Sequence, residues 1–247
     1  MLIADLFPHP PVSPLGGRPR IPPRECLEGI LWVLRTGCPW QDLPERYPSP
    51  ATCWRRLDEW TRSGVFAKAW HRLLGKLDSL KQIRWEECMA DATFSPAKKG
   101  GNSVGLTKKG KGTKIGLMVD GDGLPLSTVI AGANVAEVHM VETLVETSLD
   151  ERFPERLIYD KAADADWLRD HLAEHAVELI CPHRKNRKSS PRQDGRPLRR
   201  YRRRWIVERT ISWLQSRRRV VTRYEYHDDL FNGLVQLACL VITLKWF

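Results

Sequence analysis

Hydrophobic positions in the first third of the chain recur with the spacing of helices. Three such runs are bounded by proline, serine or glycine, residues that favour helix ends, and they cover residues 23–36, 50–63 and 65–77. A proline-rich arm over residues 1–22 precedes them. The pattern predicts a small helical domain over residues 1–80 that resembles a helix-turn-helix bundle, for which DNA contact and plain helix packing are both open.

From residue 84 onward, strand-like and helical segments alternate. An Asp-Gly-Asp-Gly turn at residues 120–123 joins two strand-like runs, as in a hairpin. The element order is three strands, a helix, a strand, a helix and a strand, and then a basic loop and a late helix. This order predicts an α/β domain over residues 81–247, with a mixed sheet flanked by helices. The predicted strands are 85–94, 113–120, 124–131, 156–159 and 177–181, and the helices between them are 135–149 and 165–175.

The C-terminal run, residues 230–247, is mostly apolar, but its strictly apolar part, residues 237–242, is far too short to cross a bilayer. It predicts a buried packing helix without membrane contact. The N-terminal residues do not form a signal peptide, and the six cysteines are scattered with no C-x-x-C pair. Reduced thiols and a cytoplasmic location are therefore expected.

Positive charge is concentrated in one segment. Residues 184–223 hold sixteen Arg and Lys against two acids, a net charge of +14, whereas the whole chain carries +10. Residues 98–114 add six lysines and no acid. Blocks of this density are typical of surfaces that bind the phosphate backbone of a nucleic acid.

Three acids occur where the element order makes them useful. Asp91 lies in the first predicted strand, Asp160 ends the fourth, and Glu208 lies on the late helix. A structural role stays open for Asp160, as a turn or capping residue, and for Glu208, as an ion-pair partner of Arg204. Taken together, three carboxylates on separate elements can hold one or two Mg²⁺ (or Mn²⁺) ions, which promote in-line phosphoryl transfer.

Two other chemistries compete with the carboxylates. The segment His171-Leu-Ala-Glu174-His175 matches the pattern H-x-x-E-H, and histidines at i and i+4 on a helix share a face that can bind zinc. The alternative is two histidines on the exposed face of a short helix, and no neighbouring feature indicates a peptidase. Tyr201 is a conceivable covalent nucleophile, but the carboxylate of Glu208 on the same helix face favours metal chemistry.

A longer pattern surrounds the late acid. Tyr201-Arg-Arg-Arg204-Trp-Ile-Val-Glu208 reads Tyr-x2-Arg-x3-Glu, which resembles the C-terminal signature of DDE insertion-sequence transposases of the IS-five/IS-four group. The segments around Asp160 (Asp-Lys-Ala-Ala-Asp-Ala-Asp) and Asp91 (Asp-Ala-Thr) are similar to those with the family's second and first acids. Residues 30–44 resemble its helical DNA-binding region, so the resemblance extends over nearly the whole chain.

The resemblance implies an RNase H-like fold for the α/β domain, with Asp91, Asp160 and Glu208 as its metal-binding catalytic triad. It further implies cleavage of double-stranded DNA at the terminal inverted repeats of the element and joining of the 3′ ends to target DNA. Holding two ends together implies a homodimer or a larger assembly. The residues expected to contact DNA are Tyr201, Arg204, Gln215, Arg217, Arg218, Lys108, Lys109, Lys111, Arg55 and Arg56.

Two positions depart from the family pattern. Gln215 stands where the family has a lysine, and Ala162-Ala163 stands where it has Gly-Tyr. Neither change touches an expected metal ligand. Two alternative functions stay open, namely an RNase H-like nuclease without a joining step, and a non-catalytic DNA-binding protein from a degenerate copy.

Overall fold

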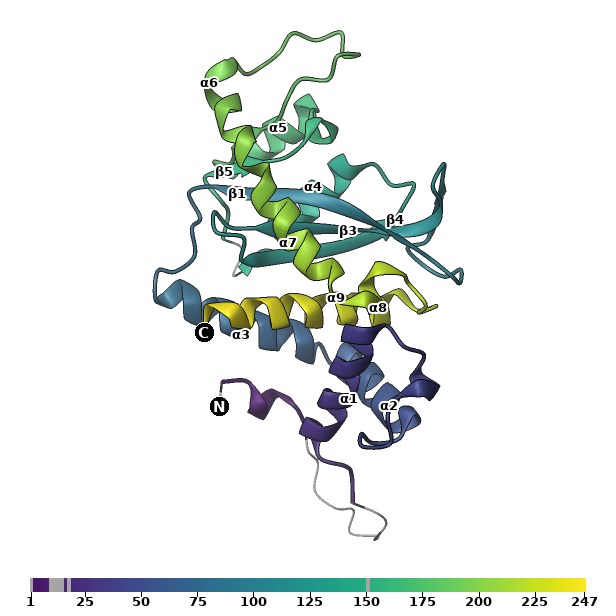
Figure 1. Ribbon diagram of the computed structural model, residues 1–247. Coiled ribbons are helices and arrows are strands. Elements are labelled where there is room, and N and C mark those ends of the chain that lie inside the picture. The colour runs from purple at the N-terminus through teal and green to yellow at the C-terminus, as the bar shows by residue number, and fades with distance from the viewer. Residues whose placement is uncertain (1, 9–15, 17–18, 150–151) are drawn as a thin grey trace.

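The computed structural model describes residues 2–8, 16, 19–149 and 152–247. The sheet occupies the upper half of the molecule in Figure 1, and the N-terminal helices lie below it. These helices are α1 (Pro23–Thr36), α2 (Pro50–Arg62) and α3 (Val65–Ser79). Their ends follow the predicted signals, since Gly37 adopts a left-handed conformation (φ 71°) after α1 and Ser49 Oγ accepts a hydrogen bond from Thr52 N at 3.4 Å.

The described residues form a six-stranded mixed sheet in which β4, β3 and β1 are antiparallel and β5 and β6 run parallel to β1. Short β2 pairs with the start of β3, and β4 pairs with the rest of it. This topology confirms the predicted RNase H-like sheet. The strands are β1 (Cys88–Pro96), β2 (Gly105–Thr107), β3 (Gly110–Val119), β4 (Pro125–Gly132), β5 (Arg156–Ile158) and β6 (Glu178–Ile180).

Two predicted boundaries in the sheet are wrong. The first strand begins at Cys88 and not at residue 85, because Trp85 lies in a turn and donates its indole N–H to Asp78 at 2.8 Å. The strand predicted over residues 113–120 is β3, which begins three residues earlier, at Gly110. It pairs with β2, a strand that was not predicted. Glycine and lysine dominate this hairpin, so it lacks the alternation of apolar and polar residues that marks a half-buried strand.

Helices cover both faces of the sheet. The late helix α7 (Trp205–Gln215) crosses the face that carries the Asp91 side chain, while α4 (Glu137–Glu146) packs on the other face. Gly116 of β3 permits this second contact, because a Cβ atom there would meet Met140 and Leu144 of α4 at 3.0–3.2 Å. Shorter helices in the described residues are α5 (Asp166–Glu174), α6 (Gly195–Leu198) and α8 (Arg218–Val221). The 3-10 turns are η1 (Ala4–Leu6), η2 (Trp40–Asp42), η4 (Lys161–Ala163), η5 (Arg199–Arg204) and η6 (Leu244–Trp246).

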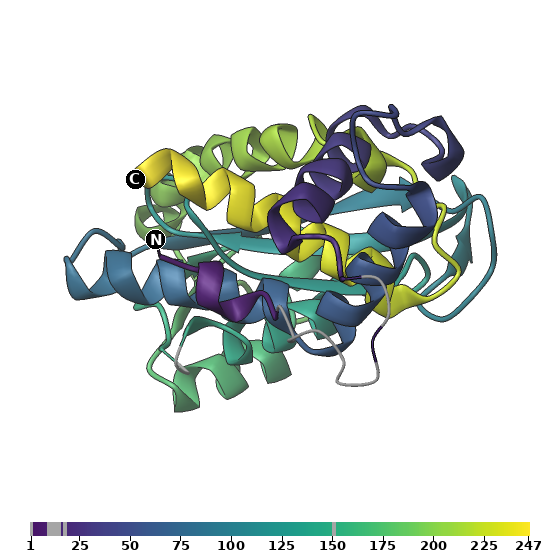
Figure 2. The ribbon, with the colours of Figure 1, turned by 90° about the horizontal axis from the view of Figure 1, so that it is seen from below.

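The C-terminal helix α9 (Asp228–Thr243) joins the two halves of the chain. It packs against α2 and α3 on one side and against β4 on the other, and Figure 2 shows α9 and α3 from below. The stretch Asp228–Trp246 is long and apolar enough to cross a membrane by composition alone, yet 61% of its most apolar window is buried inside the protein. The predicted packing helix is thus confirmed. The buried core is continuous across residue 80, so the two predicted domains share one hydrophobic interior.

The N-terminal arm is anchored where the structure describes it. Phe7 packs edge-on against Trp60 of α2, with ring centroids 5.0 Å apart. Residues 1, 9–15, 17 and 18 of the expected proline-rich arm lie outside the described residues. On α2, Trp54 is 39% exposed, whereas Leu57 and Trp60 are fully buried.

Candidate active site

The sheet register places Asp91 and Asp160 next to each other. Parallel pairing joins Met89 of β1 to Ile158 of β5, and each acid follows its paired residue by two positions. Asp160 also caps the short turn η4, because its Oδ1 accepts a hydrogen bond from Ala162 N at 2.6 Å. The capping alternative is therefore correct for one oxygen of Asp160, and it fixes this carboxylate at the end of its strand.

Arg204 connects the first and third acids. Its Nη2 donates to Asp91 Oδ2 at 2.6 Å and lies 3.6 Å from Glu208 Oε1, so both oxygens face one nitrogen atom. Arg204 also donates to the Tyr201 hydroxyl at 2.8 Å, and both residues lie in the 3-10 turn η5 that precedes α7. The ion pair between Glu208 and Arg204 considered from the sequence is present, but the same guanidinium draws Glu208 toward Asp91.

The electrostatics of the site favour an additional cation. Burial raises the pKa of Asp91 above its ordinary value, the charge and hydrogen bond of Arg204 oppose this rise, and the negative charge of Asp160 adds to it. Burial alone would lower the pKa of Arg204, but the charge of Asp91 and the hydrogen bond to Tyr201 raise it. One guanidinium thus serves neighbouring carboxylates whose charges repel each other.

Tyr159, between Ile158 and Asp160, points to the opposite face of the sheet from Asp160, because side chains alternate along a strand. Its side chain is fully buried, its hydroxyl has no hydrogen-bond partner among the described residues, and burial together with nearby carboxylates raises its pKa. This hydroxyl therefore does not belong to the site of the three acids. The carboxylate oxygens of Asp91, Asp160 and Glu208 are hard ligands of the kind that Mg²⁺ and Mn²⁺ prefer. The residues present fit a divalent metal ion.

Asp164 was not predicted as a site residue, yet it organises the loop beside Asp160. Its buried carboxylate accepts hydrogen bonds from Arg184 N at 2.9 Å and from the Arg187 guanidinium at 2.7 Å. Burial raises the pKa of Asp164, but the Arg184 N–H, Arg187 and Arg169 outweigh it and hold that pKa below its ordinary value. The Arg184 side chain in turn donates to the carbonyls of Lys161 and Ala162. The sequence signal that could have predicted this arrangement is the acid-rich segment 160–166 together with the later arginines Arg184 and Arg187.

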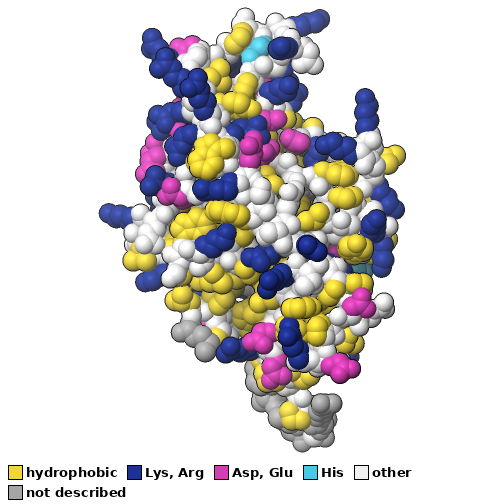
Figure 3. All heavy atoms as spheres, in the orientation of Figure 1, with side chains coloured by type: hydrophobic (Ala, Val, Ile, Leu, Met, Phe, Trp, Pro, Cys, Tyr) yellow, Lys and Arg dark blue, Asp and Glu magenta, His cyan; other side chains and the backbone are white. Residues whose placement is uncertain are grey.

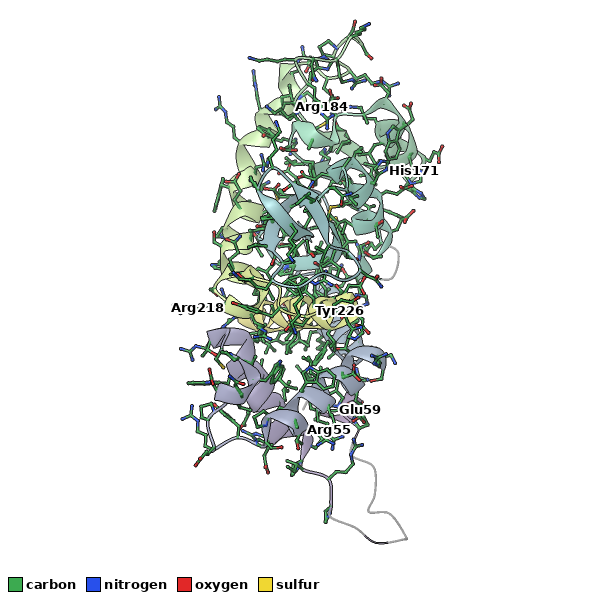
Figure 4. The ribbon with its side chains drawn as sticks, turned by 90° about the vertical axis from the view of Figure 1, so that its right-hand side faces the viewer. Arg55, Glu59, His171, Arg184, Arg218 and Tyr226 are labelled. Carbon is green, nitrogen blue, oxygen red and sulfur yellow. The ribbon has the colours of Figure 1, made fainter. Side chains whose placement is uncertain are left out.

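Lysines and arginines flank the site on an open surface. Lys108, Lys109 and Lys111 of the β2–β3 hairpin, here called the hairpin lysines, are exposed, as are Arg55 and Arg218. Figure 3 shows Lys and Arg side chains along both borders of the face crossed by α7, with a small group of acids between them. Figure 4 shows Arg218, on α8, and Arg55, on α2, in different parts of the molecule.

Arg56, which was expected to bind DNA, and two arginines of the basic segment are buried in the fold. The Arg56 side chain is 4% exposed and pairs with Glu59 at 2.8 Å, so in this structure it does not present its charge to solvent, and its contact with DNA stays a prediction. Within the basic segment, Arg219 is buried against Glu225 at 2.8 Å and donates to the Cys38 carbonyl at 3.1 Å. Arg223 is also buried and donates to backbone carbonyls. The charge of a segment thus overstates the charge that it presents to solvent.

Gln215 and Arg217 are partly accessible to solvent and also have contacts or buried atoms within the fold. Gln215 Nε2 donates to Thr93 Oγ1 at 2.8 Å, which ties the end of α7 to β1 beside Asp91. Arg217 is partly exposed, and its Nε atom is buried without a partner among the described residues. Their expected contacts with DNA stay predictions.

A mixed sheet that brings Asp91 beside Asp160, with Glu208 joined to Asp91 through Arg204, is the arrangement expected of the DDE class of phosphoryl-transfer enzymes. Comparison of the sequence with family models gives the same class. The family model "Transposase DDE domain" matches residues 87–244, and the model "Putative transposase of IS4/5 family (DUF4096)" matches residues 1–70. The chain belongs to the DDE transposase family of insertion sequences of the IS4/5 group. DDE transposases use divalent metal ions.

Individual relatives cover parts of the chain. It is 37% identical over 110 residues to "Insertion element IS402 uncharacterized 16.2 kDa protein" of Burkholderia cepacia, a match that covers 43% of this chain and 75% of that protein. It is 29% identical over 139 residues to "Putative transposase for insertion sequence element IS402" of the same organism, covering 53% of this chain and 62% of that protein.

A solved structure with a similar fold is the piggyBac transposase in a synaptic complex with hairpin DNA. The two structures superpose with a TM-score of 0.53 at 11% sequence identity, over 88% of this chain and 64% of that chain. The chain thus spans less than two thirds of this structure and of the second relative. At this identity the likeness supports the fold alone.

Proposed function

We propose that this protein cuts DNA at the ends of its insertion sequence and joins the 3′ ends to target DNA, with Asp91, Asp160 and Glu208 as the catalytic acids. The observation that carries the proposal is the convergence of these acids from three separate elements, β1, the end of β5, and α7. The family of the chain supports this transposition chemistry over a nuclease without joining and over a non-catalytic DNA-binding protein.

The three acids have separable roles in holding divalent metal ions. Asp91 is fixed by its strand and has a hydrogen bond from Ala92 N at 2.9 Å, which leaves Oδ2 for a cation in place of Arg204. Asp160 uses Oδ1 as a cap, and its other oxygen has no hydrogen bond among the described residues. Glu208 is 56% exposed, so its carboxylate is accessible to a metal ion that arrives with DNA. Bound Mg²⁺ or Mn²⁺ would activate the attacking hydroxyl and stabilise the leaving oxygen.

Arg204 and Tyr201 then become available for the DNA backbone. In this structure Arg204 neutralises Asp91, and a metal ion at the acids would release its guanidinium toward a phosphate. Tyr201 stays beside it, since the guanidinium carbon lies 5.5 Å from the Tyr201 ring centroid. The hairpin lysines and Arg218 border the same face and fit the phosphates of the duplex farther from the cut.

The proposed chemistry needs two DNA ends in one assembly, so the working form is at least a homodimer. The exposed Arg55 of α2 extends the DNA surface to the N-terminal helices. Its Nε donates to the Ala51 carbonyl at 3.1 Å, and among the described residues the other guanidinium nitrogens have no hydrogen-bond partner, which suits them to a phosphate.

The test is cleavage of a DNA duplex that carries the element's own ends, in MgCl2 or MnCl2. Asp91→Asn, Asp160→Asn and Glu208→Gln should each abolish cleavage and joining while DNA affinity stays within a few-fold of the original. Glu155→Gln, which changes an exposed acid just before β5, is the matched control and should cut normally. Metal-dependent cleavage that survives any one of the three changes removes that acid from the proposed site, and cleavage without joining favours the nuclease alternative.

A further inference from the structure

A second group of metal-ligand side chains lies between α4 and α5, away from the three acids. On α5, His171 places its Nε2 atom 3.3 Å from Glu142 Oε1 and 3.9 Å from Glu146 Oε1, both on α4. One nitrogen and two carboxylate oxygens lie within 4.8 Å of one another. Figure 4 shows His171 at the opposite side of the molecule from Arg218.

The charges of this group are unbalanced without a cation. Glu142 and Glu146 are four residues apart on one helix face, where like charges destabilise a helix. In the described part of the chain, no lysine or arginine forms an ion pair with either of them, and His171 is the basic group within 4.0 Å. The acids at or just before the start of α5 differ in this respect, because Asp164 and Asp166 both form ion pairs with Arg187.

The distances suit a tetrahedral metal. Ligands at about 2.0–2.2 Å from zinc are roughly 3.3–3.6 Å apart, which matches the 3.3 Å between His171 Nε2 and Glu142 Oε1. Glu146 is 52% exposed, so a small rotation of its side chain can close the remaining distance. The other ring nitrogen, His171 Nδ1, lies 3.8 Å from Glu174 Oε2. A carboxylate that accepts a hydrogen bond from the second nitrogen orients a metal-binding histidine, and a small rotation of the 74% exposed Glu174 side chain would bring it within that distance.

We infer that Glu142, Glu146 and His171 bind one zinc ion, with a water molecule as fourth ligand, and that this ion clamps α4 to α5. The H-x-x-E-H pattern is used differently from the zinc-protease expectation. His175 stacks on Phe153, with ring centroids 4.4 Å apart, and the pattern's glutamate orients His171 and does not act as a base. Both clamped helices adjoin η4, the turn that follows Asp160, so the ion braces the helices around that turn.

The experiment is a titration of metal-free full-length protein with ZnCl2, in excess MgCl2 so that the hard-oxygen site is filled first. Calorimetry gives the number of zinc ions bound, and the unfolding temperature is measured in parallel. His171→Ala and Glu142→Gln should lose one equivalent of bound zinc. Glu174→Gln should keep that equivalent with roughly 10- to 100-fold weaker affinity. The matched control is His139→Ala, a histidine one turn away on α4 that stacks on Trp167.

In the original protein and the control, zinc at a hundredfold excess over its Kd should raise the unfolding temperature by roughly 5–10 °C. The rise should be absent in His171→Ala, whose unfolding temperature without zinc reports whether it folds. An equivalent of zinc that survives His171→Ala, or no zinc bound by the original protein, overturns the inference.

Discussion

Arg204 is the charge that balances Asp91, and its removal provides a quantitative test of the site. In Arg204→Ala, the Asp91 carboxylate loses a 2.6 Å ion pair and keeps a largely buried position, since the two side chains are 16–17% exposed. Breaking a buried pair from one side costs about 3–5 kcal/mol, and this partly exposed pair belongs at about 3 kcal/mol. For a chain of this size that corresponds to a fall in the unfolding temperature of roughly 6–12 °C.

The loss should depend on divalent metal. A metal ion bound by Asp91 and Glu208 replaces the missing positive charge, so MgCl2 should recover a large part of the loss in Arg204→Ala. The same salt should raise the unfolding temperature of the original protein less, because there the metal competes with Arg204 for Asp91. Urea and thermal unfolding with and without MgCl2 measure both effects. The control is Arg202→Ala, an exposed arginine two positions away. A loss below about 1 kcal/mol, or one unchanged by MgCl2, would refute this reasoning.

Three further predictions concern the fold and the DNA surface. Asp164→Asn should cost about 3 kcal/mol at neutral pH. Because the pKa of Asp164 is held below its ordinary value, the difference from the original protein should be complete above about pH 4 and close as pH falls further; a constant difference in urea unfolding would contradict this. Arg219→Ala should destabilise by about 3–5 kcal/mol, and adding Glu225→Gln should restore part of it, which chemical denaturation of the single and double variants checks. Replacing all three hairpin lysines with alanine should weaken DNA binding and lower the slope of log K against log salt by about 2–3; an unchanged slope would place DNA elsewhere.

The elements that were predictable from the sequence carry local signals. Pro23 and Gly37 bound a helix, Ser49 caps another, and the Asp-Gly-Asp-Gly turn joins two strands, because these residues act through their own backbone preferences. The hairpin of β2 and β3 was missed because it lacks an apolar face. The three acids were proposed from their places within a strand (Asp91), at a strand end (Asp160) and on the late helix (Glu208), and from the resemblance to a family.

The fate of individual arginines was not predictable in the same way. Arg219 is buried because Cys38, 181 positions earlier in the chain, accepts its hydrogen bond. Arg56 is buried between α2 and its neighbours, and Arg204 reaches Asp91 across 113 positions. A basic residue in a sequence predicts charge, and tertiary contacts decide whether that charge meets solvent, a carboxylate or DNA.

A crystal structure with Mn²⁺, located by its anomalous scattering, tests most directly whether Asp91, Asp160 and Glu208 bind metal. We expect one or two manganese ions held by these three acids, about 3.5–4 Å apart if two are bound, with the Arg204 guanidinium displaced from Asp91. Manganese bound elsewhere, with Glu208 still paired to Arg204 alone, would contradict the proposed catalytic site.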